Sequence, residues 1–552
     1  MRLGIDVGGT HTDAVIVDQA KGVIAKYKVK TLKEDLLGTI IHSLKEITAN
    51  QDISKITNVN LSTTLSTNAI VENRLEETAL FLSSGPGIDP ENFAIGNNTY
   101  IINGSIDHRG SEVLGLDSIQ LKKSLKECAD KNIKVFAAAT KFSTRNNKHE
   151  LAIKEAAIPF CDYITMGHEI SGLLSFPRRA ATAYYNSAVW RIYNNFINSV
   201  IDAMANIGIK APLNILKADG GTMPLEISRR VPVESILSGP AASIMGIIAL
   251  CNIKEDSVIL DIGGTTTDIA IFAAGSPLVN REGAALEGTP TLVRSLENRS
   301  IGIGGDSAIK IENGKVVTGP ERFGPCMADG GNMPCLIDAL NFKKIIQYNN
   351  RDASERGIIE LAKKNKFKAD HLADAAINFA AERINAEIEK MLFELNSKPV
   401  YTIHDMIHAE KIIPKKIYII GGPAKALADV LSGDIEILVP EDYDVANAIG
   451  AALARTTFET ELFCDTGKGK MIIPNINVEK NVTRQYNLDE AISDAKTFTR
   501  EYLRKHGIDI NLDELTITEA TNFRMINDFY SAGNDIRVKC QMKPNVVMYL
   551  HK

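Results

Sequence analysis

The chain contains one sequence pattern twice, and this repeat constrains the fold more than any other feature. Residues 3–17 read LGIDVGGTHTDAVIV, and residues 258–272 read VILDIGGTTTDIAIF. Each copy has a β-rich run with an aspartate near its end, a Gly-Gly-Thr turn and a second β-rich run, which is the pattern of a β-hairpin. The copies are 255 residues apart, far too distant for a solenoid repeat. The repeat therefore predicts two similar domains, each of which opens with the same hairpin.

The segments that follow the first hairpin alternate between predicted strands and predicted helices. Residues 57–62 and 78–83 have the composition of strands, whereas residues 34–49 and 118–131 have the apolar spacing of helices. A long helical stretch is expected at residues 178–207. Because strands and helices alternate in this way, the sequence predicts an α/β domain.

The length and the later segments indicate how the chain divides into domains. A chain of 552 residues is too long for one hydrophobic core, since a domain has about 150 residues. The sequence is rich in Ala, Glu and Lys at positions 342–397, and from about residue 460 apolar alternation replaces this helical pattern. We predict three domains: residues 1–180, residues 181–457 with a helical insertion at about 342–397, and a small α+β domain at residues 458–552.

The composition and charge exclude several classes of protein. With 44% hydrophobic and 24% charged residues, the chain is neither intrinsically disordered nor collagen-like. A formal net charge of −6 gives no indication of nucleic-acid binding. We find no secretory pattern and no apolar run of about 18 residues, so we expect a cytoplasmic protein without a membrane span. The seven dispersed cysteines predict free thiols, and the nearest pair, Cys326 and Cys335, is only a weak zinc signal.

The Gly-Gly-Thr turns of the two hairpins suit a phosphate group. Glycine lets the backbone approach an anion closely, backbone N–H groups can point toward it, and threonine hydroxyls add donors. Asp6 and Asp261 precede the turns, where carboxylates suit a Mg²⁺ ion held through water. The alternative is two ordinary glycine-turn hairpins, and the second matching copy favours the phosphate site. The predicted phosphate-binding residues are Gly8, Gly9, Thr10, Gly263, Gly264 and Thr265.

Two further Gly-Gly pairs are candidate nucleotide contacts. Gly421 and Gly422 follow an apolar strand at a predicted helix start, where a nucleoside or its phosphate can lie against the backbone. Gly304 and Gly305 precede another predicted helix start. The alternative for each pair is a tight turn without a ligand. The sequence contains no P-loop motif and no G-x-G-x-x-G fingerprint after a strand, which excludes a P-loop or Rossmann type of site.

The order of these motifs resembles the superfamily of actin, the sugar kinases and the heat-shock chaperone ATPases. Residues 237–243 and 444–452 look like the two helices that connect the domains in that superfamily. The resemblance extends from residue 1 to about residue 457. It implies an α/β fold in which two duplicated ribonuclease-H-like, actin-like ATPase domains close on ATP and Mg²⁺, followed by a small C-terminal α+β appendage.

A closer resemblance, to the hydantoinase A/oxoprolinase family, rests on six motifs in family order. It implies ATP-dependent opening of a cyclic amide, such as a hydantoin or 5-oxoproline, through phosphorylation of the amide oxygen. The family also includes ATP-dependent carboxylase subunits, so a second hydantoinase-type subunit or a second copy of this chain would be its protein partner. The motifs are IDVGGTHTDAVIVD (5–18), STTLSTNAIVE (62–72), ADGGTMP (218–224), SGPAAS (238–243), DIGGTTTDIA (261–270) and IGIGGDSA (301–308).

The chain departs from the family pattern in three places and has a shorter tail, which marks it as a divergent, short member. Leu61 and Ser62 stand where the family has His-Gly, residues 297–299 stand where it has Asp-x-His, and residues 324–331 lack the usual Pro-Gly-Pro-Ala-Cys stretch. The Asp-x-His pair is the family's expected metal or substrate contact. We therefore expect retained nucleotide chemistry and altered substrate chemistry.

Arg299 is the most informative of these replacements. An arginine cannot ligate a metal, so we expect only the Mg²⁺ that accompanies ATP. Its guanidinium suits a carboxylate or phosphate oxygen, which makes Arg299 a candidate catalytic residue that contacts an anionic substrate group or the transferred phosphate. The alternative is an ion pair with a structural acid such as Glu297 or Glu282.

Three groups of polar residues have both a functional and a structural interpretation. His11 lies in the first phosphate turn and is either a phosphate or substrate contact or an exposed turn residue. His404 and His408 would share a helix face, but without the glutamate of a zinc helix a solvated pair is favoured. Arg178 and Arg179 begin a long helix against its dipole, which points to tertiary partners.

The resemblance leaves three classes of function open. The first is an ATP-dependent hydrolase that opens a cyclic amide. The second is a nucleotide-driven reactivase or partner-protein ATPase, or a carboxylase subunit. The third is a small-molecule kinase, which would release a phosphorylated product instead of free phosphate. The identity of the ring does not follow from the sequence.

Overall fold

Both copies of the repeated pattern form the predicted hairpin in the computed structural model. Strand β1 (Arg2–Val7) pairs antiparallel with β2 (His11–Asp18), and β13 (Ser257–Ile262) pairs antiparallel with β14 (Thr267–Ala273). The two hairpins lie in different sheets and therefore open two different domains. The structure describes residues 1–280, 282–397, 411–431, 435–527 and 530–550.

The register of the two hairpins is also the same. Asp6 lies opposite Asp13, and Asp261 lies opposite Asp268. Residues that face each other across an antiparallel pair project from the same face of the sheet. Each hairpin therefore presents two aspartates on one face, close to its Gly-Gly-Thr turn.

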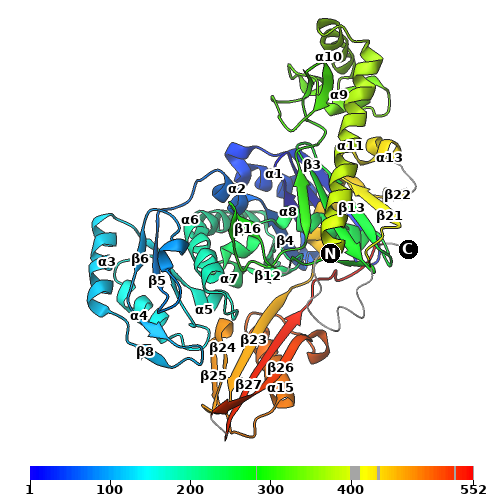
Figure 1. The fold of residues 1–552 in the computed structure, drawn as a ribbon. Helices are drawn as coiled ribbons and strands as arrows, with labels where there is room; N and C mark the ends of the chain where they lie inside the picture. The colour runs from blue at the N-terminus through cyan, green and yellow to red at the C-terminus, as the bar shows by residue number, and fades with distance from the viewer. Residues whose placement is uncertain (281, 398–410, 432–434, 528–529, 551–552) are drawn as a thin grey trace.

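The first hairpin belongs to a six-stranded sheet with the order β12-β11-β4-β1-β2-β3 (Figure 1). Strands β4 and β11 run parallel to β1, so an antiparallel hairpin is joined to a parallel half-sheet. Helix α1 and part of α6 pack against one face of this sheet. The bounds are β3 (Gly22–Lys30), α1 (Leu36–Thr48), β4 (Asn58–Thr63), β11 (Leu213–Leu216) and β12 (Thr222–Pro224).

The second hairpin belongs to a sheet of the same topology. Its order is β15-β14-β13-β21-β22, β18 also pairs with β14, and β21 and β22 run parallel to β13. The matching topology confirms the predicted pair of duplicated ribonuclease-H-like domains. The bounds are β15 (Ser276–Pro277), β16 (Ala285–Leu286), β17 (Thr289–Pro290), β18 (Asn298–Ile301), β19 (Ile309–Glu312), β20 (Lys315–Thr318), β21 (Lys416–Ile420), α13 (Ala424–Leu431) and β22 (Glu436–Leu438).

An α/β subdomain is inserted between β4 and β11. Its sheet has the order β10-β9-β5-β6 with all strands parallel, and helices flank it (Figure 1, cyan). The bounds are α2 (Leu65–Val71), β5 (Thr78–Ser83), β6 (Thr99–Ile101), β7 (Ser105–Ile106), β8 (Glu112–Leu114), α3 (Ser118–Asp130), β9 (Val135–Thr140), α4 (Lys148–Ala157), β10 (Tyr163–Met166) and α5 (Gly167–Ile170).

Helix α6 (Phe176–Ile207) joins this subdomain to the first domain. Its first half packs with the inserted sheet, and its second half, from Tyr193 onward, packs with the first sheet. The chain then returns to the first sheet as β11 and β12. The boundary predicted between residues 180 and 181 falls inside α6.

The two predicted connecting helices cross at the centre of the molecule. They are α8 (Ser238–Leu250) and α14 (Ala446–Leu453). The short helix α7 (Leu225–Ser228) of the first domain precedes α8 in the chain. A Cβ atom on Gly246 would collide with a carbonyl oxygen of α14, and one on Gly450 would collide with a carbonyl oxygen of α8. The crossing is therefore as close as two helix backbones allow.

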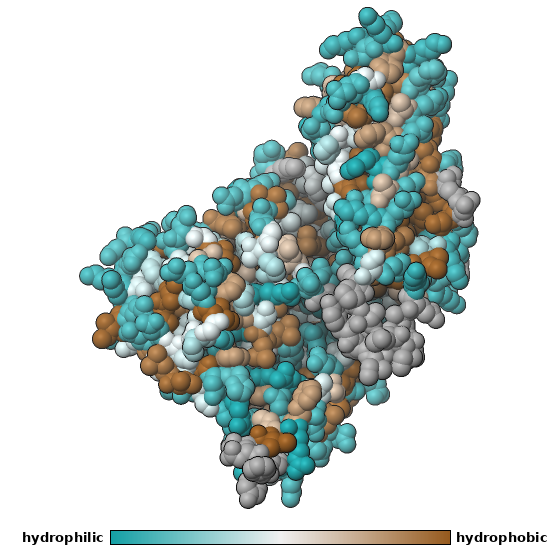
Figure 2. Space-filling view, in the orientation of Figure 1, coloured by the Kyte–Doolittle hydropathy of each residue, from teal (hydrophilic) through white to brown (hydrophobic). Residues whose placement is uncertain are grey.

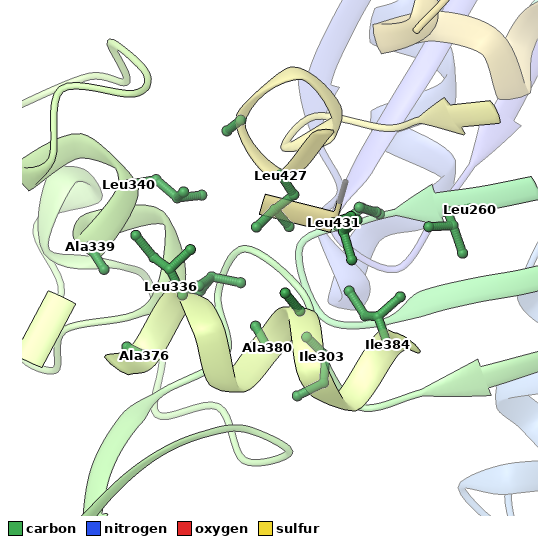
Figure 3. Close-up of a cluster of buried hydrophobic side chains, with 14 of the residues drawn as sticks. Leu260, Ile303, Leu336, Ala339, Leu340, Ala376, Ala380, Ile384, Leu427 and Leu431 are labelled. Atoms are coloured by element: carbon green, nitrogen blue, oxygen red, sulfur yellow. The ribbon is translucent and has the colours of Figure 1, made fainter. Parts of the chain in front are cut away.

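The predicted helical insertion extends away from the second sheet. Helix α9 (Leu336–Phe342) and α10 (Arg351–Lys364) lie at its outer end, and α11 (Ala369–Asn396) runs back to the sheet (Figure 1, top). Apolar side chains of α9, α11, α13 and the sheet meet in one cluster (Figure 3). The labelled members include Leu260, Leu336, Leu340, Ala380, Ile384, Leu427 and Leu431.

The C-terminal domain is a five-stranded antiparallel sheet with one helix, as the predicted α+β appendage requires. Its strand order is β25-β24-β23-β27-β26, and α15 packs on it. After β27 the chain returns to the connecting helices, where the N–H of Val547 donates to Leu453 O at 2.8 Å. The bounds are β23 (Phe458–Asp465), β24 (Lys470–Ile473), β25 (Val478–Asn481), α15 (Leu488–Lys505), β26 (Thr516–Asn527) and β27 (Tyr530–Met542).

Hydrophilic residues cover much of the helical insertion in the space-filling view, and hydrophobic residues are scattered among them (Figure 2). Within the described part of the chain, no helix has both the length and the apolar character that crossing a membrane requires.

The close crossing of the connecting helices predicts the effect of a single methyl group. Gly450→Ala places a Cβ against backbone of α8, and overpacking of this kind lowers the free energy of unfolding by about 1–3 kcal/mol. Gly239→Ala is the matched control on α8, because nothing lies within 4 Å of its added Cβ. Calorimetry should show a lower transition temperature for Gly450→Ala alone. Equal transition temperatures for the two variants would contradict the close crossing.

Candidate functional site

The two Gly-Gly-Thr turns meet although they are far apart in the sequence. The side-chain Oγ1 atoms of Thr10 and Thr265 are 3.4 Å apart. A Cβ on Gly264 would lie 3.2 Å from the side chain of Thr10. The structure therefore brings the two predicted groups, Gly8–Thr10 and Gly263–Thr265, into one place. A phosphate does not fit in the gap between the hydroxyls, so one bound by both turns lies beside this contact or separates them.

Gly304 and Gly305 support the second turn. The N–H of Gly305 donates to Gly263 O at 3.0 Å, and the N–H of Asp306 donates to Gly264 O at 2.6 Å. The N–H of Gly304 donates to the hydroxyl of Ser307 at 2.8 Å. No helix starts here, contrary to the sequence expectation, because these amides bind the hairpin turn before the chain enters β19. The pair holds the turn in place and offers few free donors to a phosphate.

Gly421 and Gly422 lie at the end of β21, level with Asp261. The register pairs Asp261 with Ile420, the last residue of that strand. Gly421 has a φ of +94°, and a Cβ there would collide with Ile262 O. Nothing lies within 4 Å of an added Cβ at Gly422. The loop is therefore open on one side, as a nucleoside that lies against the backbone requires, and α13 starts just after it as predicted.

Asp6 is buried and Asp261 is partly buried beside the connecting helices. Burial is the main cause that raises the pKa of Asp6 to about 7, and it also raises the pKa of Asp261. Asp261 accepts hydrogen bonds from Ser243 of α8 at 2.5 Å and from Asn447 of α14 at 3.4 Å. Oδ1 of Asp6 is buried and has no hydrogen-bond partner among the described residues. These carboxylates thus lie where the two domains are joined.

Two more carboxylates, Asp13, which is buried, and Asp268, which is partly buried, were not selected from the sequence. Burial raises the pKa of Asp13 to about 6 and that of Asp268 to about 7. Lys28 Nζ lies 2.7 Å from Asp13 Oδ1. Both aspartates belong to the repeated pattern, and the antiparallel register places them opposite the two selected ones. Register reasoning applied to the predicted hairpins was the signal that could have found them.

The four aspartates fit a Mg²⁺ ion that is held mainly through water. Their donors are all carboxylate oxygens, which Mg²⁺ prefers, and one oxygen of Asp6 is unpartnered. Within the described residues, no three His, Cys, Asp or Glu side chains are grouped closely enough to hold a metal directly. Mg²⁺ keeps much of its hydration shell beside phosphates, so this spacing suits it.

The first turn is surrounded by cations. Lys30 Nζ lies 2.7 Å from Asp329, and Arg322 lies 2.7 Å from Asp306. His11 lies among them, and burial together with Lys28 and Lys30 lowers its pKa to about 4. Its imidazole is therefore neutral at pH 7 and can contact a phosphate only as a neutral hydrogen-bonding group.

Three lysines of β3 connect the first domain to the second. Lys26 Nζ lies 3.2 Å from Asp442, Lys28 Nζ donates to Asp444 O at 2.9 Å, and Lys30 pairs with Asp329. Alternate residues of a strand project to the same side, so one strand supplies all three contacts. These contacts hold the two domains in the closed arrangement that the turns require.

Arg299 takes the structural role rather than the catalytic one. It lies opposite Ile269, whereas its neighbour Ser300 lies opposite Asp268. Successive side chains of a strand point to opposite faces, so Arg299 faces away from the four aspartates. Its guanidinium lies 2.7 Å from a carboxylate oxygen of Glu387 on α11.

A second glutamate completes that ion pair and corrects the sequence expectation. Arg299 also lies 2.5 Å from Glu394, about two turns further along α11. The acids are thus those of the helical insertion, not Glu297 or Glu282. Because both acids bind its guanidinium, Arg299 is not proposed to contact a substrate or phosphate group.

The remaining candidates have structural roles where the structure describes them. Arg179 is fully buried and donates to the carbonyl oxygens of Leu173 and Thr140, which are the expected tertiary partners. Cys326 and Cys335 are buried in a small apolar cluster. His404 and His408 lie outside the described residues.

The burial of Asp268 predicts how stability depends on pH without nucleotide and Mg²⁺. Its pKa in the folded chain, about 7, lies above the ordinary 3.8. Its contribution to the free energy of unfolding is therefore fully present below pH 4 and is lost as the pH rises through about 7. Asp268→Asn should therefore stabilise the chain at pH 8, by up to about 4 kcal/mol, and hardly at pH 4.

Thermal denaturation at the two pH values, with a chelator present, measures this difference. Asp202→Asn on the exposed side of α6 is the control and should change neither transition temperature. A pH-independent effect of Asp268→Asn would show that folding does not raise the pKa of Asp268.

The family model of hydantoinase/oxoprolinase matches residues 179–460, and the model of the hydantoinase/oxoprolinase N-terminal region matches residues 2–159. An uncharacterised protein of Methanocaldococcus jannaschii is 24% identical over 528 residues, covering 86% of this chain and 74% of that protein. The caprolactamase subunit alpha of Pseudomonas jessenii is 25% identical over 379 residues, covering 61% and 53%. The acetophenone carboxylase gamma subunit of Aromatoleum aromaticum is 22% identical over 563 residues, covering 92% and 75%.

Two solved structures share the fold over nearly the whole chain. Nucleotide-free acetone carboxylase superposes with a TM-score of 0.72 at 14% identity, covering 99% of this chain and 88% of that one. The ATP-dependent caprolactamase of Pseudomonas jessenii superposes with a TM-score of 0.71 at 17% identity, covering 98% and 87%. Together with the family models, which match most of the sequence, these findings show that the chain belongs to the hydantoinase/oxoprolinase family.

Proposed function

We propose that the protein is an ATP-dependent hydrolase that opens a cyclic amide by phosphorylating the amide oxygen. The observation that carries this proposal is the meeting of two matched Gly-Gly-Thr turns, each on a hairpin with two facing aspartates. Family membership supports it, because the relatives include a caprolactamase subunit and 5-oxoprolinases. The proposed cofactors are ATP and Mg²⁺.

The chain's own groups account for nucleotide binding in this proposal. The threonine hydroxyls and backbone N–H groups of the two turns donate to phosphate oxygens, and the open side of Gly422 receives the nucleoside. Lys30 and Arg322 lie near the first turn, each in an ion pair with an aspartate. Mg²⁺, when bound, would neutralise phosphate charge, and Asp6 and Asp261 would hold its water ligands.

The proposed reaction uses ATP to make the amide carbon electrophilic. Amide resonance otherwise protects that carbon from water. The amide oxygen attacks the γ-phosphorus, and the bond to the β-phosphate oxygen breaks to release ADP. Water attacks the activated carbon, the ring C–N bond breaks with its electron pair on a protonated nitrogen, and a second water hydrolyses the acyl phosphate. Positioning and charge neutralisation by fixed donors supply most of the catalysis.

A subunit of an ATP-dependent carboxylase is the second candidate. The acetophenone carboxylase gamma subunit aligns with 92% of this chain, a larger share than the caprolactamase subunit does. Both relatives are named as subunits, so we propose that this chain also acts with a second, hydantoinase-type subunit. A carboxylase would consume bicarbonate with ATP, which separates the two candidates experimentally.

Phosphate release in the presence of ring compounds tests the proposed hydrolase. We expect ATP-dependent phosphate release that requires a lactam, a hydantoin or 5-oxoproline, with one ring opened for each phosphate released. A phosphorylated ring product without free phosphate would identify a kinase. Release that requires bicarbonate and a ketone, and no ring, would identify the carboxylase.

The paired aspartates predict a specific loss of turnover. Asp6→Asn and Asp261→Asn each remove a carboxylate next to a phosphate turn and should lower ATP turnover at least about a hundredfold while the fold is kept. Steady-state phosphate release and circular dichroism measure the two effects. Asp202→Asn, far from the turns on α6, is the control with unchanged turnover. Wild-type rates in both site variants would refute the Mg²⁺ assignment.

A further inference from the structure

A cavity of about 210 Å³ lies between the inserted subdomain and the C-terminal domain. The inserted subdomain contributes Arg145, in the turn after β9, and residues 172–174, which precede α6. Strands β23, β26 and β27 contribute most of the other wall. Among the described residues that line the cavity, none belongs to the predicted phosphate-binding groups. The cavity is therefore separate from the two phosphate turns.

Two arginines of the inserted subdomain reach the same face of the C-terminal sheet. Phe463 and Asp465 are two residues apart on β23, so their side chains project from one face. Arg109 meets a carboxylate there, with its Nη2 atom 2.8 Å and its Nε atom 3.0 Å from Oδ2 of Asp465. Arg145 lies instead over the ring of Phe463, with its guanidinium carbon 3.0 Å from the ring centroid.

Arg145 has no acid of its own, although its side chain is only 9% exposed. Its Nε atom is enclosed without a hydrogen-bond partner among the described residues. The terminal nitrogens also form no hydrogen bond or ion pair with a described residue, but they are not enclosed, and the residue lines the cavity. A ligand in the cavity can therefore reach the terminal nitrogens.

A buried guanidinium without a partner is costly for the fold. Arginine is rarely buried unless it is paired, because removing a charge from water costs free energy. Burial lowers the pKa of Arg145 to about 9, so the group is still a cation at pH 7. The neighbouring acids are committed elsewhere, since Asp465 pairs with Arg109 and Asp535 lies 2.9 Å from Arg537. An anionic ligand would supply the missing partner.

The turn that carries Arg145 has further unsatisfied polar groups. The hydroxyls of Thr140, Ser143 and Thr144 are buried without a hydrogen-bond partner among the described residues. Phe142 has a φ of +61°, which an aromatic residue rarely adopts. Backbone strain of this kind is typical of ligand sites, where the surrounding structure maintains it. The turn thus holds Arg145 beside the cavity at a cost in free energy.

The rest of the lining selects the class of anion. Glu461 and Glu519 also line the cavity, so they would repel a second negative charge on a ligand. A singly charged group therefore suits the cavity better than a phosphate dianion. A carboxylate also matches the planar fork of a guanidinium.

The size and the remaining walls limit the body of the ligand. A volume of about 210 Å³ corresponds to roughly seven water molecules. Apolar side chains supply much of the surface, so a short hydrocarbon chain can pack against them. They are Leu173, Leu174, Phe463 and Pro474.

We propose that this cavity binds a small monocarboxylate with an apolar body, such as butyrate, and that the terminal nitrogens of Arg145 donate to its carboxylate oxygens. The inference goes beyond the proposed function, because it assigns a second ligand site outside the phosphate turns. It does not depend on the hydrolase activity, so either proposal can fail without the other.

Three probes that differ in charge test the class of ligand. Binding of butyrate, butyramide and inorganic phosphate to the full chain is measured by titration calorimetry without nucleotide, at one ionic strength and at pH 8, where phosphate is mainly a dianion. We expect butyrate to bind at least about tenfold more tightly than butyramide, which has the same shape without the charge. Binding is assigned to the cavity only where Arg145→Met removes it, because phosphate can also bind at the two turns.

Arg145→Met should weaken butyrate binding at least about tenfold. It should not lower the transition temperature of the ligand-free chain, because the cation has no acid to lose. Lys141→Met is the matched control in the same turn, since Lys141 Nζ donates to Pro86 O and the residue does not line the cavity. It should leave butyrate binding unchanged. If Arg145→Met fails to fold, Arg145→Lys decides, and it should weaken binding several-fold because it lacks the planar fork.

Equal binding of butyrate and butyramide, no butyrate binding, or unchanged butyrate binding in the Arg145 variants would overturn the proposal. Phosphate that binds more tightly than butyrate and is lost in Arg145→Met would also overturn it, because the site would then prefer a dianion.

Discussion

The contact between the two connecting helices is the constraint on which the rest of the structure depends. Gly246 and Gly450 let the backbones of α8 and α14 touch, and a larger residue at either place would separate the domains. Ser243 and Asn447, one from each helix, donate to Asp261. The crossing that sets the relation of the domains therefore also sets the position of a predicted site carboxylate. A change in the angle between the helices would move the turns and the acid together.

The buried aspartates are costly for the fold, which argues for a ligand. Burial raises the pKa of three of them to between about 6 and 7, and Lys28 is the cation paired with one. A bound cation would lower that cost, because it favours the ionised form. The lysines of β3 meanwhile hold the domains together through acids of the second domain. The contacts between the domains thus depend on the lysines of β3, whereas cation binding would depend on the aspartates of the hairpins beside them.

The sequence predicted the parts of the site that lie within a continuous motif. The hairpins, Asp6 and Asp261 followed from one repeated pattern, and the family followed from six motifs. Asp13 and Asp268 required the strand register in addition. Arg299 was misassigned because its role depends on which face of β18 it occupies, and that strand has no pattern of its own in the sequence. Gly304 and Gly305 resembled a helix start locally, but their amides bind the hairpin turn, which is a tertiary interaction.

The internal repeat also distinguishes the structural elements that occur in both halves of the chain from those that occur in only one half. In the proposed function, the repeated elements, two hairpins with their turns and aspartates, bind the phosphate chain, the feature common to every ATP-dependent reaction. A cavity of about 420 Å³ has walls from the inserted subdomain, the C-terminal domain and the turn after β11, and the inserted subdomain and C-terminal domain have no counterpart in the other half. Because those walls meet only in three dimensions, no short motif could reveal them. Substrate choice can then change through the unrepeated parts without disturbing the hairpins, which is consistent with relatives of one fold that carry the names of a lactamase and of carboxylases.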